Sequence, residues 1–240
     1  MTRSQIIVDI VENNIKLSDA LYRVILIAKE LDNKDLIDWA KMEVNGYKNI
    51  ENVPDYRKTV STSFRYSGIN GSFQIKSAML DTSFLRDEIL DKVKNVAIFE
   101  DINSVETKMN AENDTFEVDV TFLAPEIYAN SNNGYTGIQC TSARQLIAKQ
   151  LFSSIYNEVK TKLIDILTLV EKEIGNLDKI DLSKKVKSKK SKVNNEISQL
   201  FNFSEMAIET VPSKIFWKII IPIATAILGG LAVLLIYELL

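Results

Sequence analysis

The residues from Ile219 to Tyr237 form an uninterrupted apolar run, IIIPIATAILGGLAVLLIY, without a charged side chain. As an α-helix this run would be about 28 Å long, close to the hydrocarbon thickness of a bilayer. It lacks the polar stripe that a helix on the surface of a soluble domain shows. We therefore predict one transmembrane helix over residues 214–240, preceded by a folded domain. The alternative interpretation is a buried core helix.

The residues that flank this run favour the membrane. Lys214 and Lys218 lie one helical turn apart just before it, where long side chains can reach the lipid head groups. Phe216 and Trp217 lie beside them, at the depth typical of interfacial aromatic residues. The excess of lysine on the N-terminal side predicts a cytoplasmic domain, and the first ten residues do not resemble a secretory signal. We expect a single-pass protein of the cell membrane, with almost nothing translocated.

Composition excludes several kinds of catalytic site. The 240 residues include no histidine, which excludes Ser-His-Asp and Cys-His catalysis and removes the commonest transition-metal ligand. A single cysteine, Cys140, cannot form an intrachain disulfide and fits a reducing compartment. No glycine-rich phosphate loop is visible, and a net charge of −3 gives no support to direct nucleic-acid binding. We expect a protein that is not an enzyme, with no cofactor and no metal.

The first fifty residues predict a small helical cluster. A short helix is expected over residues 5–13, with Ser4 as its N-cap, and apolar residues then recur every three or four positions. Ser18 is the expected N-cap of the second helix and Asn33 that of the third. Gly46 is well placed to end the third helix.

The pattern then changes to the alternation of strands. Residues 56–66 and 72–76 predict two strands around a turn at 68–71, and residues 115–122 alternate in the same way. Residues 80–105 favour a helix, and residues 142–174 show the stripe of a long helix that ends at Gly175. The order predicts an α+β domain with a small antiparallel sheet over residues 1–175. A lysine-rich linker with an amphipathic patch follows over residues 176–213.

The linker contains the basic run SKKVKSKKSK upstream of the predicted membrane helix. Such a polybasic segment attracts anionic lipid, and the alternatives are a solvated linker or a nucleic-acid-binding tail. We favour lipid contact because the segment is tethered near the bilayer. The predicted lipid-binding residues are Lys184, Lys185, Lys187, Lys189, Lys190, Lys192, Lys214 and Lys218.

The stretch from Leu17 to about Arg57 resembles the start of the AbiTii domain, a family of bacterial and archaeal abortive-infection and antiviral operons. The resemblance also includes the last helix, around residues 144–174, and it is weak between residues 76 and 133. The residues that carry it here are Leu36, Trp39, Glu43, Gly46, Tyr47, Pro54, Tyr56 and Arg57.

The resemblance, taken with the membrane tail, implies a toxic membrane effector of an antiviral system. A narrower hypothesis is the membrane partner of a short archaeal Argonaute. The partners implied are anionic lipid, a sensor or effector protein of the same operon, and further copies of the chain, because one span cannot enclose a pore. The alternative is an anchor or adaptor that holds a defence nuclease or sensor without permeabilising the membrane.

The resemblance supplies no catalytic mechanism, so each notable residue is interpreted physically. Trp39 and Tyr47 are expected to pack in the helical cluster, and Glu43 with Arg57 to form an ion pair between helix and strand. Arg57 and Arg65 would share one strand face, either as a partner surface or as a solvated face. Strand alternation makes Glu117 and Asp119 the solvent side of their strand rather than paired catalytic acids.

Overall fold

The computed structural model describes residues 3–131, 137–179 and 189–200. The chain divides into two compact units, Met1–Ile197 and Ser198–Leu240, and the description below concerns the first. The family-like domain was expected to end at residue 175, but the compact unit extends to Ile197.

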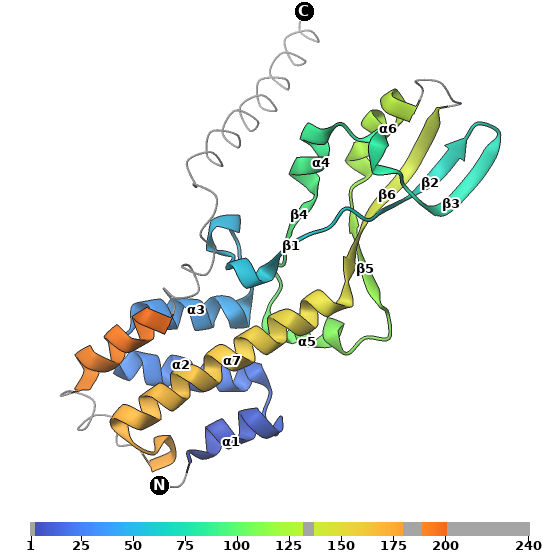
Figure 1. Ribbon diagram of the computed structural model, residues 1–240. Helices are drawn as coiled ribbons and strands as arrows, with labels where there is room; N and C mark the ends of the chain where they lie inside the picture. The colour runs from blue at the N-terminus through green and yellow to red at the C-terminus, as the bar shows by residue number, and fades with distance from the viewer. Residues whose placement is uncertain (1–2, 132–136, 180–188, 201–240) are drawn as a thin grey trace, which may run out of the picture. The chain divides into compact units, whose positions relative to one another are not determined.

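The N-terminal part is the predicted helical cluster (Figure 1). Its helices are α1 (Gln5–Glu12), α2 (Leu17–Glu30) and α3 (Lys34–Asn45). The α1 and α2 helices contact α7 (Lys149–Ile174), and α2 contacts α3. The fully buried side chains that they contribute recur at helical spacing, which explains why these segments are helices. They include Ile10, Leu17, Leu21, Val24, Ala28, Leu36, Ala40, Ile155, Val159 and Leu163.

The predicted helix ends are correct in part. The side chain of Asn33 accepts a hydrogen bond from the Leu36 amide and caps α3, as expected. Ser18 is not a cap, because α2 begins at Leu17 and its N-cap position is Lys16. Ser4 holds the N-cap position of α1, but its hydroxyl donates to Glu171 of α7 instead of capping. This bond ties the start of α1 to α7.

The main sheet is antiparallel, with the strand order β3-β2-β6-β5. Its strands are β2 (Phe64–Asn70), β3 (Phe73–Met79), β5 (Thr115–Asp119) and β6 (Ile138–Ala148). A second, two-stranded sheet joins β1 (Lys58–Val60) to β4 (Asn95–Ala97). One face of the main sheet packs on α6 (Ala124–Ser131) and on neighbouring turns. The buried cluster on that face contains Phe64, Tyr66, Leu80, Leu85, Val120, Leu123, Ile127, Ile138 and Ala143.

The long C-terminal helix begins later than the sequence predicted. Residues 138–148 form β6, and α7 starts only at Lys149. The side chains of Ala143, Gln145 and Ile147 alternate into the buried face, while β6 pairs with β2 on one side and β5 on the other. The prediction of a helix from residue 142 was wrong because Ile147 fits both the helical stripe and the strand alternation.

The strand expected over residues 56–66 is interrupted. A 3-10 turn spans Asp55–Arg57, β1 follows, and β2 begins only at Phe64. The expected turn at residues 68–71 also begins too early, because β2 continues to Asn70. Gly68 lies where the ladder shifts register, and a Cβ there would come within 2.1 Å of the Gln139 carbonyl oxygen. Glycine therefore allows β2 and β6 to approach closely.

Residues 80–122 agree with expectation only in part. They contain the helices α4 (Asp87–Val93) and α5 (Ile102–Met109), but β4 lies between them. The strand β5 ends at Asp119, and a 3-10 turn at Thr121–Leu123 carries Phe122 outward, 69% exposed. The strand expected over residues 115–122 is therefore shorter than predicted, and Phe122 lies beyond its end.

Residues 189–200 form a helix, of which the part up to Ile197 belongs to the compact unit. Val193 and Ile197 on this helix are fully buried. The side chain of Asn194 donates to the carbonyl oxygen of Leu31 at the end of α2. Part of the predicted linker is thus packed against the helical cluster.

The predicted transmembrane helix over residues 214–240 lies outside the described residues. Within the described ranges, no helix has the length and apolar character needed to cross a bilayer.

Candidate functional site

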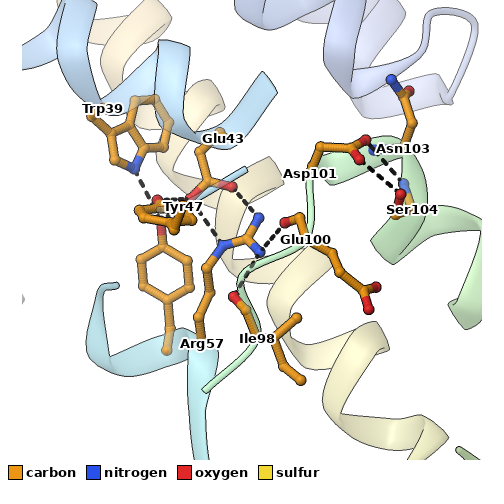
Figure 2. A network of polar contacts seen from close by, with 10 residues as sticks. Trp39, Glu43, Tyr47, Arg57, Ile98, Glu100, Asp101, Asn103 and Ser104 are labelled. Atoms are coloured by element: carbon orange, nitrogen blue, oxygen red, sulfur yellow. Dashed lines mark hydrogen bonds and ion pairs between the residues drawn. The ribbon is translucent and has the colours of Figure 1, made fainter. Parts of the chain in front are cut away.

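Five of the residues that carry the family resemblance form one buried polar network (Figure 2): Trp39, Glu43, Tyr47, Tyr56 and Arg57. Trp39 and Glu43 lie one turn apart on α3. The chain then leaves α3 through Gly46, whose φ of 80° is unfavourable for other residues. This turn places Tyr47 beside Glu43, to which its hydroxyl donates. Pro54, at the N-cap of the 3-10 turn Asp55–Arg57, precedes Tyr56.

The centre of the network is a fully buried ion pair. The Arg57 Nη2 lies 2.5 Å from the Glu43 Oε2, and both side chains are inaccessible to solvent. The Arg57 Nε donates to the other carboxylate oxygen at 3.2 Å. Burial lowers the pKa of Arg57, but the hydrogen bonds and charge of Glu43 outweigh it and raise that pKa. The predicted ion pair between Glu43 and Arg57 is therefore confirmed.

Aromatic residues complete the surroundings of the Glu43 carboxylate. Its Oε1 accepts hydrogen bonds from the hydroxyls of Tyr47 and Tyr56. The Trp39 indole N–H donates to the Tyr56 hydroxyl at 2.9 Å, and the Arg57 guanidinium lies 4.9 Å from the centre of the Tyr47 ring. Trp39 and Tyr47 are both buried, as predicted.

The network also holds a segment that the sequence did not reveal. The Arg57 Nη1 donates to the carbonyl oxygens of Ile98 and Glu100, at 3.4 Å and 2.7 Å. The Tyr47 amide donates to the Phe99 carbonyl at 2.7 Å. Backbone carbonyls carry no side-chain signature, so no feature of the sequence pointed to this segment.

Asp101 continues this segment into α5. It is the N-cap of that helix and accepts hydrogen bonds from the amides of Asn103 and Ser104 and from the Ser104 hydroxyl (Figure 2). Burial raises the pKa of Asp101, but these hydrogen bonds outweigh it and lower that pKa. The network therefore fastens α3 to the segment that begins α5.

The chemistry of the network is that of a structural clamp. Each Glu43 oxygen already accepts from Arg57 or from a tyrosine, and each guanidinium nitrogen of Arg57 has an acceptor. A buried charge with its hydrogen bonds filled by the protein has little capacity left for a ligand. The residues that identify the family hold the fold together here.

Because of Tyr47 and Tyr56, the domain is expected to lose stability as the pH becomes alkaline. Burial raises the pKa of each hydroxyl from the ordinary value of 10.0, and the charge of Glu43 raises it further. Above about pH 10 only the unfolded chain readily loses these protons, so their contribution is complete below that pH and falls as pH rises. Urea unfolding between pH 8 and pH 11 is expected to show this fall. Tyr47→Phe should reduce the slope, and exposed Tyr22→Phe should not.

The partner face predicted from Arg57 and Arg65 does not form. Arg57 lies in the 3-10 turn before β1 and is fully buried, because Glu43 and two carbonyls surround its guanidinium. Arg65 lies on β2 and is exposed. Its cross-strand neighbour is Arg144 of β6, which pairs in turn with Asp119 of β5. Glu117 is also exposed on β5, so this strand does present an acidic solvent side.

Three of the eight lysines predicted to bind lipid lie in the described residues, and all three contact the folded domain at the ends of α7 and α2. Lys189 donates to the Glu173 carbonyl at the end of α7, and Lys192 pairs with the Glu173 carboxylate at 2.8 Å. Lys190 pairs with Asp32 after α2. The hydrogen bond from Lys192 lowers the pKa of Glu173. Lys184, Lys185, Lys187, Lys214 and Lys218 lie outside the described residues.

An open hollow of about 700 Å³ lies at the start of α4. Its lining mixes acidic, basic and apolar side chains, among them Asp87, Arg86 and Leu90. Within the described part of the chain, acidic and cysteine side chains form no cluster of three or more suited to a metal ion. The buried network thus remains the best-defined polar site of the domain.

The AbiTii family model matches residues 3–195, which is most of the chain. No curated protein and no solved structure matches the chain.

Proposed function

Because this chain belongs to the AbiTii family, which indicates a role in abortive-infection defence, we propose that it is a membrane-anchored effector of such a system. In this proposal a protein from the same operon detects infection and activates the AbiTii domain. The chain then perturbs the membrane and arrests or kills the infected cell.

The observation that carries the proposal is the uncharged apolar run from Ile219 to Tyr237, downstream of the family domain. Its length suits a bilayer, and Lys214 and Lys218 precede it.

The buried network stabilises the fold of the domain rather than presenting a reactive group. The Glu43 carboxylate and the Arg57 guanidinium are already hydrogen-bonded to each other within the domain. A rigid domain of this kind can receive a partner and transmit its binding to a membrane segment. Since a single helix cannot enclose a water-filled path, perturbation requires several copies to gather, and anionic lipid would attract the linker lysines.

The test compares the full chain with a version that lacks residues from Lys214 onward. Both are expressed with the operon partner, and membrane potential is followed with a voltage-sensitive dye during infection. We expect depolarisation with the full chain and its loss with the deletion, at equal protein levels and with the domain folded by circular dichroism. Depolarisation that persists without residues 214–240 would rule the proposal out.

A second variant tests whether the chain is instead a passive anchor. The absence of charge in the apolar run favours this alternative, because no charged side chain within it would line a water path. Replacing residues 219–237 with an unrelated transmembrane helix should preserve defence if the run only anchors. An effector should lose depolarisation and protection in the same exchange.

A further inference from the structure

The main sheet has two open edges, formed by β3 and β5 at opposite ends of the strand order (Figure 1). Among the described residues, no strand pairs with the outer side of either one. Backbone N–H and C=O groups on such an edge can pair with a strand of another chain. The side chains of the two edges determine which partner fits.

The polar sides of the two edges carry opposite charges. On β3, Ile75 and Ala78 pack against the sheet's buried cluster, so Lys76 projects from the opposite face. On β5, Asp119 lies on the same face as Lys76. Residues that pair directly across strands share a face, and Asp119 pairs with Arg144, Arg144 with Arg65, and Arg65 with Met79 of β3. Met79 follows Ala78, which packs on the buried cluster, so Met79 lies on the opposite face. Glu117, two residues before Asp119, shares its side of the strand.

The apolar sides of the two edges also match. Phe73 lies two residues before Ile75 on β3, on the side of the buried cluster, and is 74% exposed. Val118 of β5 pairs with Gln145, which is buried on that same side, and Val118 is 43% exposed. Exposed apolar side chains on both open edges leave surface that a neighbouring edge would cover.

We propose that β3 of one copy pairs with β5 of a second copy, so that the chain assembles head to tail. This contact places Lys76 near Glu117 of the neighbouring copy and Phe73 near its Val118. Each like pair of edges is disfavoured, since β3 with β3 would oppose lysines and β5 with β5 would oppose carboxylates. The charges therefore select the unlike pair.

The strand directions permit this contact. Successive strands of the sheet are antiparallel, so β3 runs opposite to β5. A second copy in the same orientation would continue the antiparallel order across the junction. Such a contact uses different surfaces on the two copies and generates a ring or a filament.

The contact is expected to be weak in dilute solution. Ser77 on β3 has a φ of 50°, and the ladder is irregular opposite it, so only part of β3 can pair regularly. β5 is five residues long. Confinement of the chains to one membrane would raise their effective concentration and favour assembly. The inference itself does not depend on the proposed toxic function, since a passive anchor could assemble in the same way.

The experiment uses charge reversal in the full chain, purified in detergent and reconstituted in neutral liposomes. Lys76→Glu and Glu117→Lys are made singly and together, and Lys48→Glu and Glu30→Lys serve as exposed charge controls outside the sheet. Assembly is measured by sedimentation velocity in detergent and by chemical crosslinking in liposomes. Circular dichroism verifies the fold of each variant.

We expect wild-type oligomers, and for each single edge variant a half-assembly concentration about tenfold higher or more. The double variant should recover assembly, because its β3 edge is acidic and its β5 edge is basic. An equal mixture of the two single variants should also recover assembly, because edges of opposite charge can then meet between the two variants. Species larger than dimers distinguish this contact from a symmetric pair. A wild-type chain that stays monomeric in both media would overturn the proposal. Assembly unaffected by all edge variants, or a double variant as weak as the singles, would overturn it as well.

Discussion

Glu43→Gln is expected to lower the free energy of unfolding by about 3–5 kcal/mol, the usual cost of breaking a buried ion pair from one side. Glutamine keeps the volume of glutamate, so the change creates no cavity. It removes the charge that faces Arg57, and its amide NH₂ would confront the Arg57 donors, which lie 2.5 Å and 3.2 Å from the carboxylate oxygens. The guanidinium would then be left charged, buried and partly unpaired.

Urea unfolding followed by circular dichroism measures this loss of stability. Two further variants test whether the loss comes from the buried ion pair. Lys58→Gln breaks the exposed pair between Lys58 and Asp55 and should change stability little. Arg57→Met should cost much less on the Glu43→Gln background than alone, because the two residues act as one unit. If Glu43→Gln were as mild as Lys58→Gln, the network would not be the clamp described here.

Gly46→Ala is expected to cost about 2–4 kcal/mol, through backbone strain and a direct clash. The φ of Gly46 is 80°, and a Cβ there would come within 2.7 Å of the Phe99 carbonyl oxygen. That same oxygen accepts the Tyr47 amide, so the clash would also disturb the approach of the segment to α3. Thermal and urea unfolding of the variant measure the combined effect.

Gly175→Ala is the matched control for this effect. Gly175 has a φ of 106°, but a Cβ there would meet no atom within 4 Å. The control therefore carries backbone strain without the clash, and the difference between the two variants reports the contact with Phe99. Equal losses in the two variants would contradict a close approach of residues 98–101 to α3.

These expected losses bear on what the family motif means. The motif residues converge on a network whose hydrogen bonds are filled from within, so their substitution should unfold the domain before it alters any binding surface. A loss of defence on mutating Glu43 or Arg57 would therefore need a stability measurement beside it. The exposed charges of the sheet edges are better positions at which to separate function from folding.

The sequence by itself determined the α+β class and the helical N-terminal cluster, and it gave the pairing of Glu43 with Arg57 only as an expectation. Asn33 and Gly46 mark helix ends through local chemistry, one with a side-chain acceptor and the other with a left-handed backbone. Local rules of this kind can be read from neighbouring residues alone.

Only the tertiary structure decided the course of residues 138–148 and the position of Arg57. Ala143, Leu146 and Ile147 have the spacing of one helix face. Residues 143–147 nevertheless form a strand, because β2 and β5 supply backbone partners on both sides. Arg57 could have faced solvent beside Arg65. It is buried because the carbonyl oxygens of Ile98 and Glu100 accept hydrogen bonds from its Nη1. Both outcomes depend on backbone groups distant in the sequence, and a backbone group is the same for nearly every residue type.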